Sequence, residues 1–200
     1  MTRAVVLASS NAGKLREINQ ILAGLDIEAA PQSQFQVPDA EETGLSFVEN
    51  AILKARNAAR HAHVPAIADD SGIEVDFLNG APGIYSARYA GPGASDAQNL
   101  QKLLADLKQV PPEKRSARFR CVMVYLRHAN DPTPLIAHGT WEGRILDAAR
   151  GSHGFGYDPV FFVPTHDCTS AELPPEIKNQ LSHRAQALRA LVIALEKVRV

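Results

Sequence analysis

The chain has 200 residues, of which 45% are apolar and 22% are charged, and its formal net charge is −1 at pH 7. This length is sufficient for a substantial core, and we expect residues 1–200 to form a single domain. The near-zero charge argues against nucleic-acid binding, which needs a basic face. No stretch approaches the ~20 apolar residues of a membrane span. The apolar run at the start of the chain is too short for a signal peptide. The two cysteines lie far apart in the sequence, which is typical of reduced thiols. We therefore expect a cytoplasmic protein.

The first element predicted is a short buried strand over residues 4–8. Apolar residues at helical spacing follow from Leu15 to Leu22. A strand, a loop of small residues and a helix start can together bind an anion through free amides, the helix dipole and Lys14. The glycine spacing of a P-loop is missing. A plain strand-to-helix turn with an exposed lysine explains the same residues equally well. The loop consists of Ser9, Ser10, Asn11, Ala12, Gly13 and Lys14.

A second short strand is predicted over residues 26–30, before a loop that carries Glu41 and Glu42. Acidic residues in a loop are usually only solvated. A capping box over residues 46–49 then opens a helix that runs to about residue 62. On this helix Asn50 and Lys54 share one face, which we interpret as a solvated stripe.

The stretch from residue 66 to residue 76 is the most unusual part of the chain. An apolar run leads into two adjacent carboxylates, Asp69 and Asp70, and Ser71 and Gly72 follow. Apolar and acidic residues then alternate over residues 73–76, which is the period-two pattern of a strand. A buried strand that ends in two acids is costly unless the charge is compensated, and a divalent cation with oxygen ligands is the usual compensation. The same four residues are also ordinary turn composition.

Residues 95–145 are predicted to form one helix and two strands. A capped amphipathic helix is predicted over residues 95–108, and two strands over 117–126 and 135–145. A turn near Asn130 and Asp131 joins these strands, which predicts an antiparallel section within the sheet.

Residues 150–159 form a second unusual stretch, in which glycines alternate with His153, Phe155 and Tyr157. Glycines allow the backbone to approach a ligand closely, and an aromatic ring in such a loop can stack on a nucleobase. A glycine-rich hairpin with a partly buried aromatic residue is an equal alternative. A strand over residues 160–163 is expected to follow Asp158.

Near the end, residues 175–180 predict a short helix bearing Lys178, and Ser182, His183 and Arg184 open the last helix. Cationic side chains in a first helical turn oppose the dipole's preference for anions. This mismatch indicates a ligand, although a surface pair explains it too.

Together these features describe a site for a nucleoside triphosphate with magnesium. Lys14, Lys178 and Arg184 can neutralise phosphate charge, carboxylates can hold Mg²⁺, and Phe155 can stack on the base. The expected chemistry is attack of water at phosphorus, with a carboxylate that orients or deprotonates the water. The chain has no nucleophile elbow and no Cys–His pattern, which argues for direct hydrolysis rather than a covalent intermediate.

Six separated motifs, in this order, resemble one family. The chain is similar to the inosine triphosphate pyrophosphatase family, the Ham1-type or RdgB-type enzymes, over nearly its whole length. The matching segments are residues 9–14 (SSNAGK), 41–55 (EETGLSFVENAILKA), 68–72 (ADDSG), 80–89 (GAPGIYSARY), 154–159 (GFGYDP) and 182–184 (SHR).

The resemblance implies an α/β fold: an elongated mixed β-sheet flanked by helices, with two lobes and a central nucleotide cleft. It also implies hydrolysis of the deaminated purine nucleotides ITP, dITP and XTP to the monophosphate and pyrophosphate, which cleanses the nucleotide pool. Magnesium is the implied cofactor, and a homodimer is the implied assembly. Neither nucleic acid nor membrane is an expected partner.

The resemblance also implies roles for individual residues. The loop from Ser9 to Lys14 would hold phosphates, and Glu41 and Asp70 would serve the metal, with Asp70 also the proton acceptor for water. Each of these acidic residues has an acidic neighbour, in the pairs 41–42 and 69–70. The sequence does not determine which member of each pair points inward. The residues implied to contact the substrate and its base are Ser71, Phe155, Gly156, Tyr157, Asp158, Lys178, His183 and Arg184.

Base selectivity has a physical basis. Hypoxanthine and xanthine carry an oxygen at position 6, where adenine carries an amino group. A donor aimed at this oxygen, such as Arg184 or a nearby backbone N–H, loses its partner when adenine is bound, which can discriminate by about 10⁴ or more.

Two alternatives remain at this level. A Maf-type pyrophosphatase would run the same reaction on modified pyrimidine nucleotides, and the motifs at 154–158 and 182–184 weigh against it. A non-catalytic nucleotide sensor is the other alternative, and the acidic pairs weigh against that because a mere binder gains little from carboxylates beside phosphate.

Overall fold

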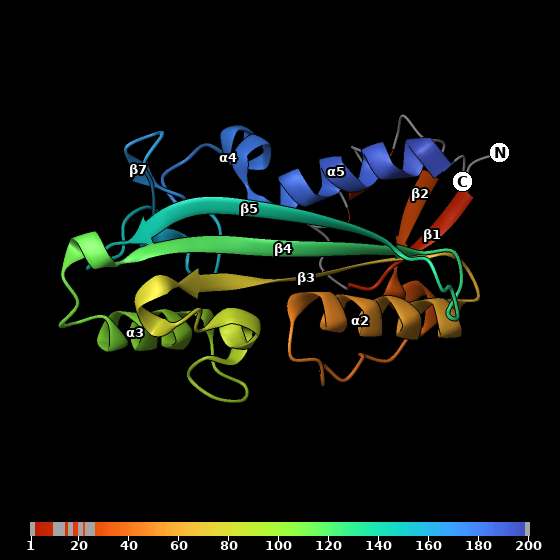
Figure 1. Ribbon diagram of the computed structural model, residues 1–200, viewed down its shortest axis with the longest axis horizontal. Coiled ribbons are helices and arrows are strands. Elements are labelled where there is room, and N and C mark those ends of the chain that lie inside the picture. Colours follow the sequence, from red (N-terminus) through yellow and green to blue (C-terminus); the bar gives the residue numbers. More distant parts are fainter. Residues whose placement is uncertain (1–2, 10–14, 16–17, 20–21, 23–26, 199–200) are drawn as a thin grey trace. The chain divides into compact units, whose positions relative to one another are not determined.

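The computed structural model describes residues 3–9, 15, 18–19, 22 and 27–198 (Figure 1). Its strands form one seven-stranded sheet with the order β2-β1-β3-β4-β5-β6-β7. Strand β1 pairs in parallel with β2 and β3, whereas β6 pairs antiparallel with β5 and β7. The sheet is therefore mixed, which confirms the predicted α/β class. The strands are β1 (Arg3–Leu7), β2 (Ile27–Pro31), β3 (Ala66–Val75), β4 (Ser116–Leu126), β5 (Leu135–Ile145), β6 (Phe161–Val163) and β7 (Cys168–Thr169).

Four α-helices are described, along with several short 3-10 helices. The α-helices are α2 (Phe47–Ala62), α3 (Asp96–Asp106), α4 (Pro175–Leu181) and α5 (His183–Val198). The 3-10 helices are η2 (Gln32–Phe35), η3 (Asp76–Leu78), η4 (Gly83–Arg88), η5 (Pro112–Lys114) and η6 (Asp158–Val160).

The residue contacts divide the chain into two compact units. Unit 1 comprises residues 1–70, 121–139 and 186–200, and unit 2 comprises residues 71–120 and 140–185. The long strands β3, β4 and β5 contribute residues to both units.

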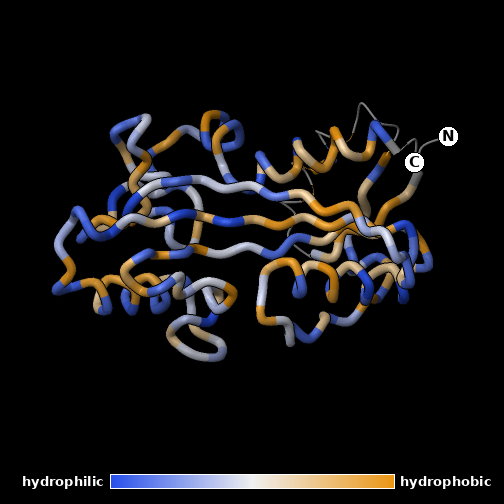
Figure 2. Tube along the Cα trace, viewed as in Figure 1, coloured by the Kyte–Doolittle hydropathy of each residue, from blue (hydrophilic) through white to orange (hydrophobic). Residues whose placement is uncertain are grey.

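Unit 1 has a core on each face of its part of the sheet. Alternate residues of a strand point to opposite faces, so β4 sends Cys121, Met123 and Tyr125 into one core and Val122 and Val124 into the other. The first core includes leucines of α5, and the second includes the alanines of α2. Because both of its faces are covered, the unit-1 part of β4 is almost entirely apolar, and Figure 2 colours it mostly as hydrophobic.

Helix α2 begins where the capping box predicts. The Ser46 hydroxyl accepts a hydrogen bond from the backbone N–H of Glu49 and donates to the Glu49 carboxylate. The packed face of α2 consists of small residues, which bring its backbone close to the sheet. Its buried alanines are Ala51, Ala55, Ala58 and Ala59.

Unit 2 has its own core, built from the second half of β3, helix α3 and an aromatic cluster. The rings of Phe119 and Trp141 both pack on Phe161. Helix α3 is capped as predicted, and the structure shows that the cap is a complete capping box between Ser95 and Gln98.

Strand β3 differs from the prediction in one respect that matters for the site. It does not end at Asp69 and Asp70 but continues to Val75 as one ten-residue strand. The reason is that Ile73 and Val75 are fully buried in the core of unit 2, so the segment gains from staying extended. Strand β6 is shorter than predicted, because residues 158–160 turn into η6 before it.

The turn between β4 and β5 is built around Asp131. This buried carboxylate accepts hydrogen bonds from the backbone N–H groups of Arg127 and Thr133 and from the Arg127 guanidinium. Against the effect of burial, the Arg127 hydrogen bonds hold the pKa of Asp131 well below its usual range.

This turn gives a pH-dependent stability. Because the folded-state pKa of Asp131 is depressed, its contribution is complete above the ordinary pKa of about 3.9 and is lost as the pH falls below it. Asp131→Asn removes the ion pair, so we expect a lower urea midpoint than that of the unaltered protein at pH 7 and a shrinking difference toward pH 3. The control is Asp147→Asn, at an exposed carboxylate. A gap between the Asp131 variant and the unaltered protein that is constant with pH would contradict the prediction.

Among the described residues, no helix has the length and apolar character needed to cross a membrane.

Candidate active site

A lysine and two carboxylates meet in unit 1. The Lys54 ammonium of α2 lies 2.7 Å from Asp70 Oδ1 on β3 and 3.1 Å from Glu42 Oε1 in the loop before α2. All three side chains are mostly buried, and only 10% of the Asp70 side chain is exposed. Glu42 was one member of the acidic pair that the sequence left open, whereas Lys54 was not predicted as a site residue. The only sequence signal for Lys54 was its place in the motif at residues 41–55.

The loop that carries Glu42 is held against α2 by Gly44 and Asn50. The backbone N–H of Gly44 donates to Asn50 Oδ1 at 2.8 Å. A Cβ at position 44 would lie only 2.6 Å from the Cβ of Glu49 and 2.7 Å from Asn50 Oδ1, so only glycine fits. This contact fixes the loop where Glu42 reaches Lys54.

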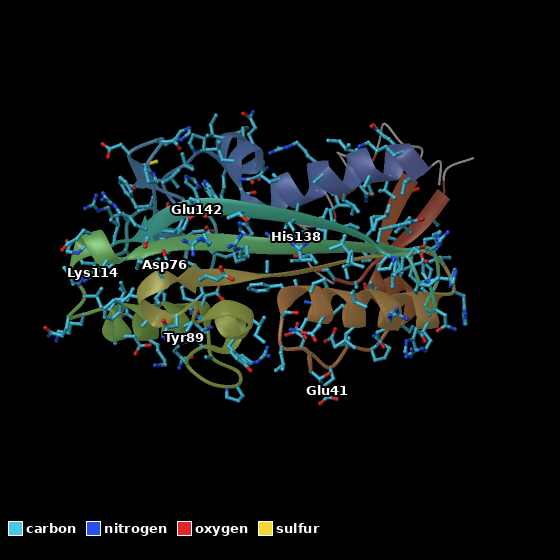
Figure 3. All side chains as sticks on the ribbon, viewed as in Figure 1. Glu41, Asp76, Tyr89, Lys114, His138 and Glu142 are labelled. Atoms are coloured by element: carbon cyan, nitrogen blue, oxygen red, sulfur yellow. The ribbon has the colours of Figure 1, made fainter. Side chains whose placement is uncertain are left out.

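One sequence interpretation is wrong here. Asn50 and Lys54 do share a face of α2, but that face is not solvated, because Asn50 is fully buried and Lys54 is ion-paired. Glu41, predicted for the metal, is exposed, and Figure 3 shows its side chain directed away from the ribbon. Of this pair, which the sequence left open, Glu42 is the member that contacts Lys54, and the metal role stays a prediction.

The structure also distinguishes the two adjacent aspartates. Neighbouring residues of a strand point to opposite faces, so only one of the pair can meet Lys54, and it is Asp70. Burial raises the pKa of the Asp70 carboxyl, with help from Glu42 and Asp69, and Lys54 opposes this rise only in part. Its second oxygen, Oδ2, is buried and has no hydrogen-bond partner in the described part of the chain. An unused buried carboxylate oxygen is costly unless a ligand completes it.

A second polar group lies in unit 2 around Asp158. This carboxylate is buried, forms an ion pair with Lys178 of α4, and accepts from the Ser170 hydroxyl at 2.7 Å and the Phe155 backbone N–H at 2.8 Å. The sequence had placed Asp158 against the substrate. That role stays a prediction, and the contacts show that Asp158 also holds Lys178 and the Phe155 backbone in place, with Ser170 as a partner that was not predicted.

The glycine-rich loop is shaped to fit this buried pair. Gly154 has φ +79°, and a Cβ there would lie 2.1 Å from Asp158 Oδ2 and 2.8 Å from the Lys178 nitrogen. The next residue, Phe155, exposes 59% of its surface, and the Lys178 ammonium lies 5.5 Å from its ring centre. An exposed aromatic face beside a cation suits a flat, polar ring such as a nucleobase.

Two further contacts hold the loop in place. The Gly156 backbone N–H donates to the Asp96 carboxylate at the start of α3, at 2.9 Å. The Tyr157 ring is buried, and its hydroxyl donates to the Ser86 carbonyl at 2.7 Å. Gly156 and Tyr157 therefore support the loop, and Phe155 is its presented side chain.

The start of α5 adds a buried guanidinium. Arg184 is 9% exposed, and its Nη2 donates to the Ser71 hydroxyl at 3.1 Å. The His183 ring is buried and stacks on Phe119, with the planes 12° apart and the centres separated by 4.8 Å. Both side chains are buried, so the alternative of a surface pair is wrong, and the ligand suspected at this helix start stays a prediction.

The proposed phosphate loop is largely outside the described residues. Ser9 is described and half-buried, and its backbone N–H donates to the Leu7 carbonyl at 2.7 Å. The remaining predicted members, Ser10, Asn11, Ala12, Gly13 and Lys14, lie outside the described residues.

These features define a class of protein. Unit 1 of this α/β protein contains a buried carboxylate–lysine cluster, and unit 2 contains a cation-bearing aromatic loop that is suited to a planar ring. In the part of the chain that the structure describes, no group of three or more His, Cys, Asp or Glu side chains forms a ready metal cage.

Comparison with known proteins identifies the family. The model of the Ham1 family matches residues 5–194, and the chain belongs to this family. A protein of Thioalkalivibrio sulfidiphilus named dITP/XTP pyrophosphatase is 64% identical over 96% of this chain and 98% of its own. One of the same name from Vibrio cholerae is 58% identical over 98% of each chain.

Solved structures agree with the fold. A HAM1 protein from Coxiella burnetii superposes with a TM-score of 0.93 at 52% identity, covering 98% of this chain and 99% of its own. The Ham1 protein of Staphylococcus aureus gives a TM-score of 0.89 at 44% identity, covering 98% of this chain and 100% of its own. The predicted inosine triphosphate pyrophosphatase (Ham1-type) resemblance is confirmed.

Proposed function

We propose that this protein is a nucleoside triphosphate pyrophosphatase for the deaminated purine nucleotides ITP, dITP and XTP. One water molecule attacks at phosphorus, and the products are the nucleoside monophosphate and pyrophosphate. The buried Asp70 with its Lys54 partner is the observation that carries the proposal. Relatives with 57–64% identity are named dITP/XTP pyrophosphatase, which supports the substrate class.

In this proposal Asp70 is the proton acceptor for the attacking water. Burial raises its pKa, which makes its carboxylate a stronger base than an exposed aspartate. Lys54 holds one oxygen of Asp70 at 2.7 Å and so fixes the direction of the other. The Lys54 charge also keeps the carboxylate ionised and ready to accept the proton.

We also propose magnesium as the cofactor. The unpartnered Asp70 Oδ2 is an oxygen ligand of the hard type that Mg²⁺ prefers. Glu42, which also forms an ion pair with Lys54, supplies a second carboxylate nearby. Mg²⁺ commonly binds proteins through one or two carboxylates, completed by water and phosphate oxygens. When bound, it would neutralise phosphate charge during the displacement.

The base is assigned to unit 2. Phe155 offers its ring face for stacking, and Lys178 beside it donates toward polar atoms of the base. Arg184, buried and held by Ser71, supplies donors for a 6-oxygen, which adenine does not have. Buried donors that lose their partner reject the wrong base strongly.

We extend the proposal to a homodimer in the cytoplasm. The resemblance of the six motifs to the family supports the dimer, and free purine nucleotides as substrates support the compartment. Light scattering on the purified chain tests the dimer directly, and a mass of one chain would reject it.

Pyrophosphate release tests the proposed activity, with ITP, XTP, GTP and ATP compared side by side with and without magnesium. We expect magnesium-dependent release from ITP and XTP and at most about 1% of that rate from ATP, because the 6-amino group leaves buried donors unpaired. Equal release from all four would retain the hydrolase and discard the role of Arg184. Preference for a modified pyrimidine nucleotide would favour the Maf-type alternative. Tight ITP binding with no release would favour a sensor.

A further inference from the structure

Unit 1 contains a pocket that none of the active-site residues lines. It lies at the C-terminal end of α2, against the turn that joins β4 and β5, and its volume is about 380 Å³. This volume falls within the range of small-molecule sites. The lining residues are Ala59, Arg60, His63, Val64, Pro65, Arg127, His128, Ala129 and Asn130.

The lining combines apolar and basic side chains. Four lining residues are small or apolar, four are arginine or histidine, and none is acidic. Arg127 is paired with Asp131 through Nε and Nη2. Within the described part of the chain, Arg127 Nη1 and the side chains of Arg60, His63 and His128 have no hydrogen-bond or ion-pair partner. The pocket therefore gathers donors that no protein acceptor uses.

Helix chemistry explains only half of this arrangement. Basic residues are favoured in a last helical turn because they offset the negative end of the dipole, which accounts for Arg60 and His63. Arg127 and His128 belong to the turn after β4, so the dipole of α2 does not explain why they line the same pocket.

The two walls of the pocket are held together by Arg56. Its guanidinium, on α2, donates to the Ala129 carbonyl at 3.1 Å and to the Asp131 carbonyl at 3.4 Å in the turn. The turn is also closed by the buried Asp131. The donors are thus presented from a preorganised frame, which lowers the cost of binding.

We propose that this pocket binds a small organic phosphate at a site separate from the active site. Guanidinium groups match phosphate oxygens in geometry and charge, and the imidazoles add N–H donors. The apolar residues Ala59, Val64 and Pro65 accommodate the organic part. This proposal does not depend on the proposed function.

Phenyl phosphate is the probe, because it joins a phosphate to a small apolar ring and is not a nucleotide. Titration into the full-length protein, followed by amide and imidazole NMR signals, is expected to shift residues 59–65 and 127–130 in a saturable way. Phenol and benzoate are expected to bind more weakly, because they lack the doubly charged group.

Charge reversal locates the binding. Arg60→Glu is expected to weaken phenyl phosphate binding by roughly tenfold or more, and His128→Ala by a smaller factor. Lys108→Glu is the matched control, because it makes the same charge change at an exposed residue outside the pocket. ITP hydrolysis should be unchanged in all three variants.

Two outcomes would overturn the proposal. Equal affinity of phenyl phosphate for Arg60→Glu and Lys108→Glu, or signal shifts confined to residues outside the pocket, would reject the site. Inorganic phosphate that binds as tightly as phenyl phosphate would reject the assignment to an organic ligand in favour of the free anion.

Discussion

Asp70→Asn is expected to lower kcat for ITP by about 10²- to 10⁴-fold, the usual contribution of a general base. The amide has nearly the same size and still accepts a hydrogen bond from Lys54, so the fold and the Lys54 position should persist. It cannot accept a proton from water, however. ITP binding, measured by calorimetry, should therefore remain detectable while pyrophosphate release is almost lost.

Asp69→Asn is the matched control for this variant. Asp69 is also buried and is adjacent in β3, but alternation along the strand directs its side chain to the opposite face, whereas Asp70 accepts a hydrogen bond from Lys54. It influences the site through its charge, so we expect a much smaller loss of kcat. Normal turnover by the Asp70 variant would show that the proton acceptor is another residue, and a larger loss in the Asp69 variant would exchange the two roles.

Gly154→Ala is expected to have the second largest effect, a rise in KM for ITP of roughly tenfold or more. The new methyl group would overlap Asp158 Oδ2 at 2.1 Å and crowd Lys178 at 2.8 Å. Relief of this overlap must move the buried ion pair or the loop, and either movement displaces Phe155. The left-handed backbone at φ +79° adds strain of about 1–2 kcal/mol for any residue with a side chain.

Gly156→Ala distinguishes the effect of the steric overlap from the effect of the backbone strain. Gly156 also has positive φ, +61°, but a Cβ there meets no atom within 4 Å. Its variant therefore carries the backbone strain without the collision and should raise KM only slightly. Similar KM values for the two variants would show that backbone strain, and not the fit around Asp158, governs the loop.

The sequence by itself determined most of the secondary structure. The capping boxes at Ser46 and Ser95 place the starts of α2 and α3 correctly, because these signals are local and involve residues three positions apart. The strands predicted over 117–126 and 135–145 agree with β4 and β5 to within one residue. The strand pattern after Gly72 was visible in the sequence, but its continuity with the strand before Asp69 was not predicted, because the burial of Ile73 and Val75 depends on a core made by distant segments.

The composition of the site was only partly predictable from the sequence. The motifs led to Asp70, Phe155, Lys178, His183 and Arg184, because unusual residues at strand ends and in glycine-rich loops are visible in the sequence. Local patterns could not show that Asp158 is enclosed by Ser170 and Lys178, since these three residues come from separate segments.

Only the tertiary structure decided which member of each acidic pair points inward. Alternation along a strand requires Asp69 and Asp70 to face opposite ways, but the face that meets Lys54 depends on how α2 packs on the sheet. The preference for Glu42 over Glu41 depends on the anchoring of its loop through Gly44 and Asn50. The pairing of Arg184 with Ser71 spans 113 residues, and a contact of that separation exists only once the strands and helices have assembled.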